Sequence, residues 1–339
     1  MKSFDEFATY REIKSQAEAW TQAMERTRAV SLPKAEDYQQ VVFTGCGSTY
    51  YLALAAAALY QELTGCAARG VPAGELLFQP RTILTDQKNL LVAISRSGTT
   101  SETVKAVENF RAEKRGEIVV ISNYGEVLAP LADVNIVIEK GQEDSVAQTR
   151  SYASMYMAAT TLSARMAGRQ DLINAMDGLP NACNLVIRNY ESFAQELGSN
   201  LDFDRFYFLG SGTRYGLACE LNLKMKEMTL THSEPFHFME FRHGPMSMVN
   251  ENAVVIGMLS DSNRAQEAKV LSEMKALGGT VMGLGEKETD LVFESEIPES
   301  VRGALYLPAL QLMALYRSVA KGLNPDRPRN LTAVVQLNL

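Results

Sequence analysis

The chain has 339 residues, 46% hydrophobic and 22% charged, which is enough to build folded cores and suggests two domains. A net charge of −7 without a block of Lys and Arg argues against nucleic acid or an anionic membrane surface as the main partner. No apolar run approaches the roughly 20 residues that cross a bilayer, and the N-terminus has no signal-peptide pattern. Four scattered cysteines predict free thiols, so a cytoplasmic protein that binds no membrane is expected.

Along the chain, a helical arm is predicted first, over residues 4–30. Short β-branched runs then predict strands that are buried on both faces of a parallel sheet, at 40–44, 90–94, 118–121 and 134–138. Amphipathic stretches such as residues 101–114 predict the helices between them, and residues 167–200 predict a polar helical connector. Strands that alternate with helices predict right-handed crossovers and a doubly wound α/β sheet.

A shift of 165 residues aligns the chain with itself. It places residues 43–50 over 208–215, Glu62 over Glu227, Glu75 over Glu240, residues 91–97 over 256–262 and Glu102 over Glu267. One offset that holds over about sixty residues predicts two copies of one structural unit. The expected organisation is an arm (1–30), a first α/β domain (31–166), a connector (167–200), a second α/β domain (201–325) and a tail over the active site (326–339).

Two polar turns in the first half are typical of an anion site. Gly-Cys-Gly-Ser-Thr at 45–49 and Ser-Arg-Ser-Gly-Thr-Thr at 95–100 each follow a predicted strand and precede a predicted helix. Ligands of open α/β sheets bind there, where backbone N–H groups of the next helix are available. Small residues and hydroxyl donors suit a phosphate monoester. The matching turns of the second half carry Arg214 and Asp261, so the first half is expected to hold the anion.

Two other interpretations of these turns remain open. A nucleotide site is disfavoured because the Gly-Lys-Ser/Thr sequence of a phosphate-binding loop is absent and Tyr50 replaces the third glycine of a dinucleotide fingerprint. Tight turns whose serines only cap helices would need no ligand at all.

All three histidines, His232, His237 and His243, fall within twelve residues of one another. Zinc is disfavoured because no two of them share a helix face and no cysteine is near, and His237 on its own suits a structural role. Just upstream, Lys224 and Glu227 lie one turn apart on a predicted helix. A carboxylate beside a cation suits a base that moves a carbon-bound proton, and an imidazole such as His243 suits the opening of a cyclic sugar. A solvated ion pair on the helix surface is the alternative.

Taken together, these residues resemble the double-SIS-domain phosphosugar isomerases and deaminases. That family includes the isomerase half of glucosamine-6-phosphate synthase and stand-alone amino-sugar-phosphate deaminases and deglycases. The resemblance covers nearly the whole chain and rests on residues 11–16, 45–50, 95–100, 145–150, 224–227, 242–245 and 326–331. It implies two tandem doubly wound, flavodoxin-like SIS domains with an N-terminal helical arm.

The resemblance also implies roles for particular residues. Phosphate-binding positions are matched by Ser48, Thr49, Ser95, Arg96, Ser97 and Thr100, and further substrate contacts by Gly47, Val146, Ala147, Gln148 and Ala333. Glu227 matches the proton-shuttling base, with Lys224 beside it. His243 matches a ring-opening histidine that usually comes from the second subunit, which implies a homodimer with shared active sites. No metal or organic cofactor is implied.

Three departures from the family pattern matter. The synthase has an N-terminal glutaminase domain with no counterpart here, so glutamine-fed synthesis is not expected. Ala333 stands where the synthase and some deaminase-like relatives carry a tail lysine, and Arg150 stands where lysine is common.

The expected activity is therefore ring opening and C2-to-C1 proton transfer on an amino-sugar 6-phosphate such as glucosamine 6-phosphate. A fructosamine-6-phosphate deglycase is the second hypothesis, and a non-catalytic sugar-phosphate sensor is the third. The sensor is disfavoured because Glu227 and His243 are both present.

Overall fold

The computed structural model describes residues 3–334 and residue 337, and it divides into two compact units. The first unit contains Ser15–Glu143, Gln148–Asp177 and the tail from Thr332 on. The second unit contains the residues up to Lys14, Asp144–Ala147 and Gly178–Leu331. Each unit therefore takes segments from distant parts of the sequence, and each builds one sheet.

The first unit has, within its described residues, a five-stranded sheet in the order β2-β1-β3-β4-β5. All of its neighbouring strands pair in parallel. Its strands are β1 (Gln40–Gly45), β2 (Ala68–Pro72), β3 (Asn89–Ser95), β4 (Gly116–Ser122) and β5 (Val134–Val137). Its helices are α2 (Gln16–Ala29), α3 (Ser48–Thr64), α4 (Ala73–Phe78), α5 (Ser101–Ala112), α6 (Arg150–Met166) and α7 (Gln170–Ala175).

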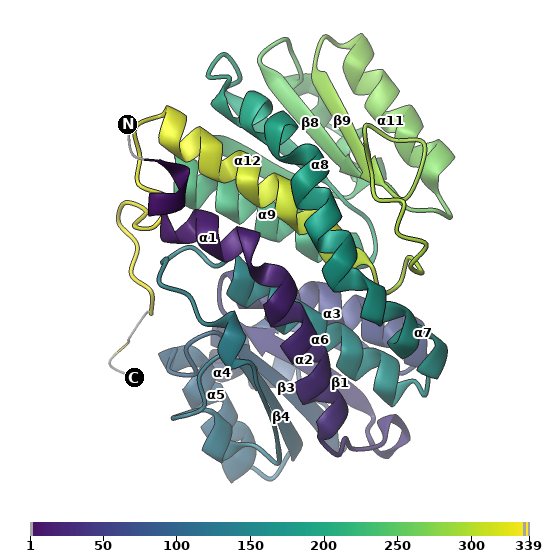
Figure 1. Cartoon of the computed structure of the whole chain (residues 1–339). Coiled ribbons are helices and arrows are strands. Elements are labelled where there is room, and N and C mark those ends of the chain that lie inside the picture. The colour runs from purple at the N-terminus through teal and green to yellow at the C-terminus, as the bar shows by residue number, and fades with distance from the viewer. Residues whose placement is uncertain (1–2, 335–336, 338–339) are drawn as a thin grey trace. The chain divides into compact units, whose positions relative to one another are not determined.

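The second unit has the same strand order about its own sheet, β7-β6-β8-β9-β10. Its strands, also parallel, are β6 (Arg205–Leu209), β7 (His232–Phe236), β8 (Ala253–Met258), β9 (Thr280–Gly285) and β10 (Leu291–Val292). Its helices are α1 (Ala8–Lys14), α8 (Leu179–Ser199), α9 (Thr213–Thr229), α10 (Phe238–Phe241), α11 (Arg264–Ala276) and α12 (Leu307–Ala320). In Figure 1, α12 runs beside α8.

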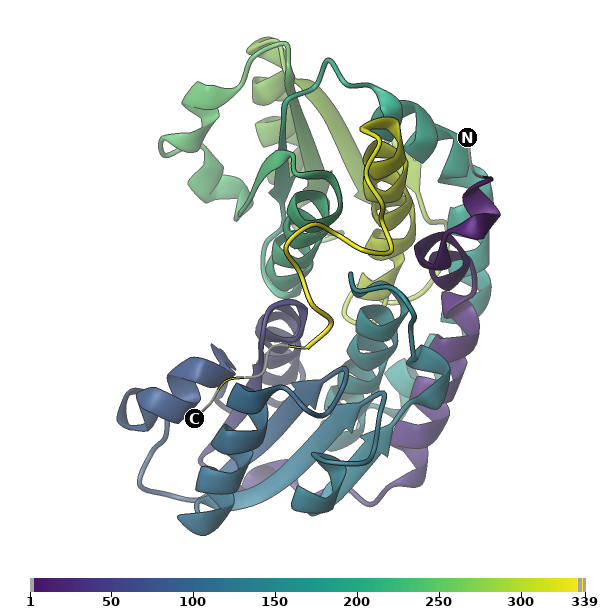
Figure 2. The ribbon, with the colours of Figure 1, turned by 90° about the vertical axis from the view of Figure 1, so that its left-hand side faces the viewer.

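Helices cover both faces of each sheet (Figure 2), which explains why the inner strands, such as β1 and β3, are buried at successive positions. In the first unit, Val42 packs into a core with α4 and α5, whereas the ring of the next residue, Phe43, lies 5.8 Å from Tyr60 of α3. The predicted doubly wound α/β architecture is therefore confirmed. The strands expected at 40–44, 90–94, 118–121 and 134–138 are β1, β3, β4 and β5.

The offset of 165 residues is visible in the elements themselves. Shifting α3 by this amount gives residues 213–229, the bounds of α9. The glycines before these helices have nearly the same backbone angles, with φ 57° and ψ −123° at Gly47 and φ 59° and ψ −130° at Gly212. Both conformations have a positive φ, which suits glycine, so the entry into α3 and the entry into α9 are built alike.

Among the described helices, none combines the length and hydropathy of a bilayer-crossing segment.

Candidate functional site

The turn after β1 brings the backbone of the first unit close to the N-terminus of α3. A Cβ on Gly45 would lie 2.7 Å from the backbone carbon of Thr49, so only glycine fits there. Cys46 N–H donates to Thr49 Oγ1 at 2.9 Å, and that hydroxyl donates to the Cys46 carbonyl at 3.0 Å. Thr49 therefore shapes the turn, and Ser48, 4% exposed, begins the helix.

The thiol of Cys46 stays protonated within this turn. Burial raises the pKa of Cys46, and the nearby Glu102 carboxylate raises it further against the hydrogen bond with Thr103. A neutral thiol adds no negative charge beside an anion, so the first turn can accept one.

The turn after β3 lies next to the turn after β1, because β1 and β3 are parallel neighbours. Ser95 Oγ accepts the Gly98 N–H at 3.1 Å, and Ser97 Oγ accepts the Thr99 N–H at 3.1 Å. Thr100 is the N-cap residue of α5, yet its side chain makes no capping hydrogen bond. The Thr100 hydroxyl therefore does not cap α5. Ser48 does not cap α3 either, because the N-cap of α3 is Gly47.

Arg96 joins this turn to the C-terminal tail. Its side chain is largely buried, with the residue 8% exposed, and its Nη2 donates to the Ala333 carbonyl at 2.6 Å. The structure thus brings together two residues that the sequence analysis named separately. Their contact uses the backbone of position 333, so it does not depend on which side chain stands there.

The loop before α6 holds another residue expected to contact substrate. Glu143 accepts the Thr149 N–H at 2.7 Å and the Thr149 hydroxyl at 2.8 Å, which fixes the start of this helix. Among the described residues, nothing donates to Gln148 Oε1, although that atom is buried. A buried acceptor without a donor costs free energy, so it suits a ligand hydroxyl or amine.

In the second unit, α9 carries an ion cluster along one face. Lys224 Nζ lies 2.5 Å from Glu227 Oε2 and 3.5 Å from Glu220 Oε1. The side chains of Lys224 and Glu220 are 1% and 0% exposed, whereas that of Glu227 is 20% exposed. The spacing of three and four residues puts all three on one helix face. Glu227 is therefore aimed by a buried cation and keeps an accessible edge, which excludes a fully solvated pair.

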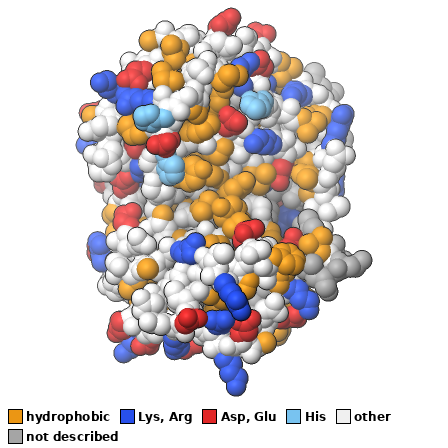
Figure 3. All heavy atoms as spheres, turned by 180° about the vertical axis from the view of Figure 1, so that it is seen from behind, with side chains coloured by type: hydrophobic (Ala, Val, Ile, Leu, Met, Phe, Trp, Pro, Cys, Tyr) orange, Lys and Arg blue, Asp and Glu red, His pale blue; other side chains and the backbone are white. Residues whose placement is uncertain are grey.

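The three histidine side chains have different surroundings. His243 is exposed after α10, and His232 is exposed at the start of β7; Figure 3 shows histidine side chains at the surface. His237 is exposed too, but its ring stacks on Tyr215 with ring centroids 3.9 Å apart, and this partial burial lowers the pKa of His237. Among the described residues, no group of three or more His, Cys, Asp or Glu is placed to hold a metal ion.

Two carboxylates that the sequence analysis did not single out hold the segment with Val146 and Ala147. Glu12 accepts from the Asp144 and Ser145 N–H groups at 2.6 and 3.2 Å, and from the Ser145 hydroxyl at 2.5 Å. Asp326 accepts from Ala8 and Thr9 N–H at the start of α1, and its carbonyl accepts the Val146 N–H at 3.0 Å. The start of the arm, up to Lys14, is therefore joined by hydrogen bonds to this loop and to the segment around Asp326 inside the second unit.

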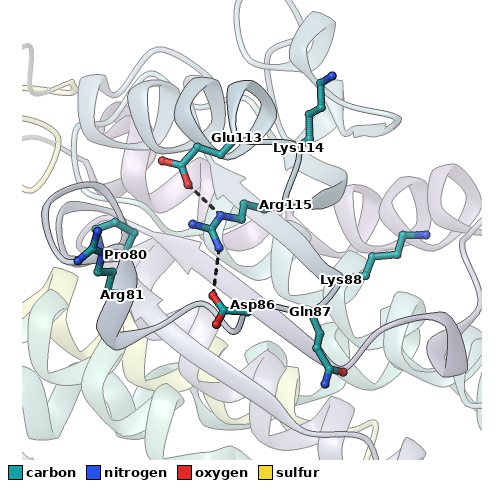
Figure 4. A pocket seen from close by; sticks show the side chains of 8 residues that line it. All are labelled: Pro80, Arg81, Asp86, Gln87, Lys88, Glu113, Lys114 and Arg115. Carbon is teal, nitrogen blue, oxygen red and sulfur yellow. Dashed lines mark hydrogen bonds and ion pairs between the residues drawn. The ribbon is translucent and has the colours of Figure 1, made fainter.

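A cleft of about 640 Å³ in the first unit lies at the opposite edge of its sheet (Figure 4). Lys88 and Arg115 come immediately before β3 and β4, whereas the polar turns follow β1 and β3. Arg115 in this cleft is engaged by Glu113 and Asp86. Ligands of open parallel sheets bind beyond the carboxyl ends of the strands, so this cleft is not the candidate site.

The predicted residues therefore form two groups, each inside one unit. The first unit holds Gly47, Ser48, Thr49, Ser95, Arg96, Ser97, Thr100, Gln148 and Ala333. The second unit holds Val146, Ala147, Lys224, Glu227 and His243. Glu220, Glu12 and Asp326 were not named as site residues. Glu220 has a signal in its spacing of four residues before Lys224, and Glu12 and Asp326 lie in the segments 11–16 and 326–331 that carry the family resemblance.

Two parallel five-stranded units in tandem, with glycine turns at their carboxyl edges, define the class of protein. The SIS-domain pattern matches residues 36–165 and 202–300 of this chain. The chain belongs to the SIS-domain family.

Among curated proteins, the chain is similar to glutamine–fructose-6-phosphate aminotransferases (isomerizing). It is 29% identical over 312 residues to that of Pyrococcus horikoshii, an alignment that covers 88% of this chain and 52% of the relative. It is 30% identical over 312 residues to that of Pyrobaculum aerophilum, covering 88% of this chain and 51% of the relative. The chain spans about half the length of these relatives.

Two solved structures share the fold. One is a glucosamine-6-phosphate deaminase from Thermotoga maritima, with a TM-score of 0.81 and 24% identity, covering 97% of this chain and 100% of that one. The other is a tagatose-6-phosphate ketose/aldose isomerase from Escherichia coli, with a TM-score of 0.86 and 21% identity, covering 96% of each chain.

Proposed function

We propose that the protein is a phosphosugar isomerase/deaminase that acts on an amino-sugar 6-phosphate such as glucosamine 6-phosphate. The observation that carries this proposal is the α9 cluster, in which buried Lys224 aims the partly exposed carboxylate of Glu227. The turns after β1 and β3 would bind the phosphate, and Glu227 would act on the sugar carbons.

In the proposed reaction, His243 moves a proton from the O1 hydroxyl to the ring oxygen, which breaks the C1–O5 bond and opens the sugar. Glu227 then removes the C2 proton, and the electron pair forms a C1–C2 double bond as the C1 carbonyl oxygen takes a proton. Delivery of a proton to C1 leaves an imine at C2. Water adds to this imine and ammonia departs, giving the ketose 6-phosphate. These steps call on protein side chains and water alone.

We propose further that the active protein is a cytoplasmic homodimer in which His243 serves the partner's site. His243 is exposed, and the same segment exposes two large apolar side chains, Met239 at 39% and Met248 at 55%. Mixing Glu227→Gln and His243→Ala chains tests this arrangement. Mixed dimers would each contain one intact site, so about a quarter of wild-type activity should return; no return of activity contradicts the shared site.

A fructosamine-6-phosphate deglycase is the second candidate, favoured by one observation. Position 333 contributes its carbonyl to Arg96 and has no amine side chain. In a deglycase, the amine of the fructosamine substrate would then take the place that a tail lysine has beside the sugar in relatives that carry one.

The experiment is an assay of ammonia and hexose 6-phosphate over a panel of amino-sugar and fructosamine 6-phosphates, with Glu227→Gln beside the wild type. Ammonia from glucosamine 6-phosphate, absent with Glu227→Gln, supports the deaminase. Glucose 6-phosphate and free amine from fructosamine substrates support the deglycase. A silent panel with tight sugar-phosphate binding overturns both in favour of a sensor.

A further inference from the structure

The second unit uses its own carboxylates at the turn that matches the glycine turn of the first unit. Arg214, the second residue of α9, stands where the first unit has Thr49 and is 7% exposed. Its guanidinium forms ion pairs with Glu267 at 3.1 Å and with Glu299. Two carboxylates of the chain itself therefore already pair with the cationic side chain at the start of α9.

The turn after β8 has the same local hydrogen bonding as the turn after β3. Asn263 N–H donates to Ser260 Oγ at 2.9 Å, and 165 residues earlier Gly98 N–H donates to Ser95 Oγ at 3.1 Å. Position 261 therefore corresponds to position 96. The Asp261 N–H donates to Glu299 Oε2 at 2.8 Å.

One carboxylate thus bridges both turns of the second unit. Glu299 receives the Arg214 guanidinium on one oxygen and the Asp261 N–H on the other. A bound oxyanion is held in the same manner at loops that lead into helix N-termini. The side chain of Glu299 is 28% exposed, so the position is open to solvent on one side.

The segment that presents Glu299 is itself fixed. Arg302, 1% exposed, donates to the Ile297 carbonyl at 2.9 Å and pairs with Asp261. Glu294 and Glu296 adopt positive φ angles of 47° and 57°, conformations that non-glycine residues rarely adopt. Strain of this kind persists where the surroundings hold the backbone in place, and such positions are often functional.

We propose that Glu299 is a built-in ligand of the second unit, whose carboxylate occupies an anion seat made by Arg214 and the Asp261 N–H. Glu299 thereby restricts phosphate monoesters to the first unit, although both units share one strand order and one glycine turn. The inference deepens the proposed function and rests on it only for the identity of the phosphorylated ligand.

The test is a titration with inorganic phosphate at constant ionic strength, followed by ³¹P NMR and by the shift in unfolding temperature. Glu299→Ala is compared with Glu251→Ala, which removes an exposed carboxylate from the same unit. Both variants also carry Arg96→Ala, so that the first unit contributes little to the measured phosphate binding. Glu299→Ala should bind phosphate roughly tenfold more tightly than the control, and adding Arg214→Leu should abolish this gain.

Equal phosphate binding by the Glu299→Ala and Glu251→Ala proteins overturns the proposal, as does a gain that survives Arg214→Leu. If Glu299→Ala does not fold, Glu299→Gln replaces it, since the amide keeps an acceptor for the Asp261 N–H but loses the charge. A gain of severalfold is then expected, and no gain overturns the proposal. Failure of the sugar-phosphate assays would leave this measurement unaffected, because it reports inorganic phosphate bound to the second unit.

Discussion

Helices α3 and α9 occupy the same place in their units and have the same length, yet they bury different chemistry. Where α9 carries Glu220, Lys224 and Glu227, α3 carries Ala55, Leu59 and Glu62. Ala55 and Leu59 are each 1% exposed, so α3 packs as an ordinary apolar helix. In the proposed function, one fold supports anion binding in the first unit and acid–base chemistry in the second, and the side chains at matched positions make the difference.

The largest expected effect comes from replacing the two glutamates that this comparison matches. Glu227→Gln should lower kcat about 10²- to 10⁴-fold with a small change in KM, because a general base contributes about that factor. Glu62→Gln, the matched change on α3, should leave kcat within about twofold of wild type. Steady-state kinetics with the substrate found in the panel measures both values of kcat. Equal losses of kcat in the two variants would contradict different roles for α3 and α9.

Copying α3 into α9 tests whether the buried ions stabilise the fold or serve only the chemistry. Lys224→Leu should destabilise the protein by about 3–5 kcal/mol, because it removes the cation between Glu220 and Glu227. Adding Glu220→Ala should restore most of that loss without restoring activity. Denaturant unfolding measures the free energies, and Lys226→Met on the exposed face of α9 is the control.

The glycine turns offer a matched pair of smaller effect. A Cβ at Gly45 would lie 2.7 Å from the backbone carbon of Thr49, and one at Gly210 would lie 2.7 Å from that of Arg214. Each change to alanine should cost about 1–3 kcal/mol of stability. Only Gly45→Ala should also weaken binding of a sugar phosphate. Gly74→Ala, whose Cβ meets nothing within 4 Å, should do neither.

Glu12 tests whether the loop with Val146 and Ala147 needs a fixed position. Glu12→Gln keeps an oxygen acceptor but cannot accept at its amide nitrogen, so it should lose about 1.5–3 kcal/mol of stability. KM for the sugar phosphate should rise severalfold while kcat changes less. Glu18→Gln, an exposed position in the same arm, is the control. An unchanged KM despite lost stability would show that Glu12 is only structural.

The smallest effect is a pH dependence from His237. Because burial lowers the folded-state pKa of His237, the unfolded chain binds more protons at mildly acidic pH. Its contribution to stability is present above the unfolded value of about 6.5 and is lost as pH falls through the folded value. The stability of the wild type relative to His237→Phe should therefore be lower at pH 5 than at pH 7.5. A difference that does not vary with pH contradicts this assignment.

Much of the fold could be predicted because its signals are local. The apolar runs of β1, β3 and β4 lie in the interior of the sheet, and most of their residues are buried. The run that forms β5 was expected to be buried on both faces as well, but β5 is an edge strand and its Asn135 is exposed. By contrast, β2 (Ala68–Pro72) was not anticipated. It is an edge strand that contains Gly70 and ends in Pro72, so pairing with β1 rather than composition defines it.

In the candidate site, too, the contacts within one helix could be predicted from the sequence, whereas the contacts between distant segments could not. Lys224 and Glu227 could be paired from their spacing on one helix, and the structure confirms that contact. Glu12 meets Ser145 across 133 residues, and Arg96 meets Ala333 across 237. Nothing in one sequence specifies such long-range contacts. The roles of Ser48, Ser95, Ser97, Thr100 and Gln148 in binding substrate stay predictions.

The central claim is that Glu227 carries hydrogen from C2 to C1 of the substrate. The most direct measurement uses glucosamine 6-phosphate deuterated at C2, with the ketose product examined by NMR. The account predicts slower turnover than with the protium substrate, some deuterium at C1 of the product, and almost no product from Glu227→Gln. Product formed by Glu227→Gln at the wild-type rate, with deuterium at C1, would contradict it.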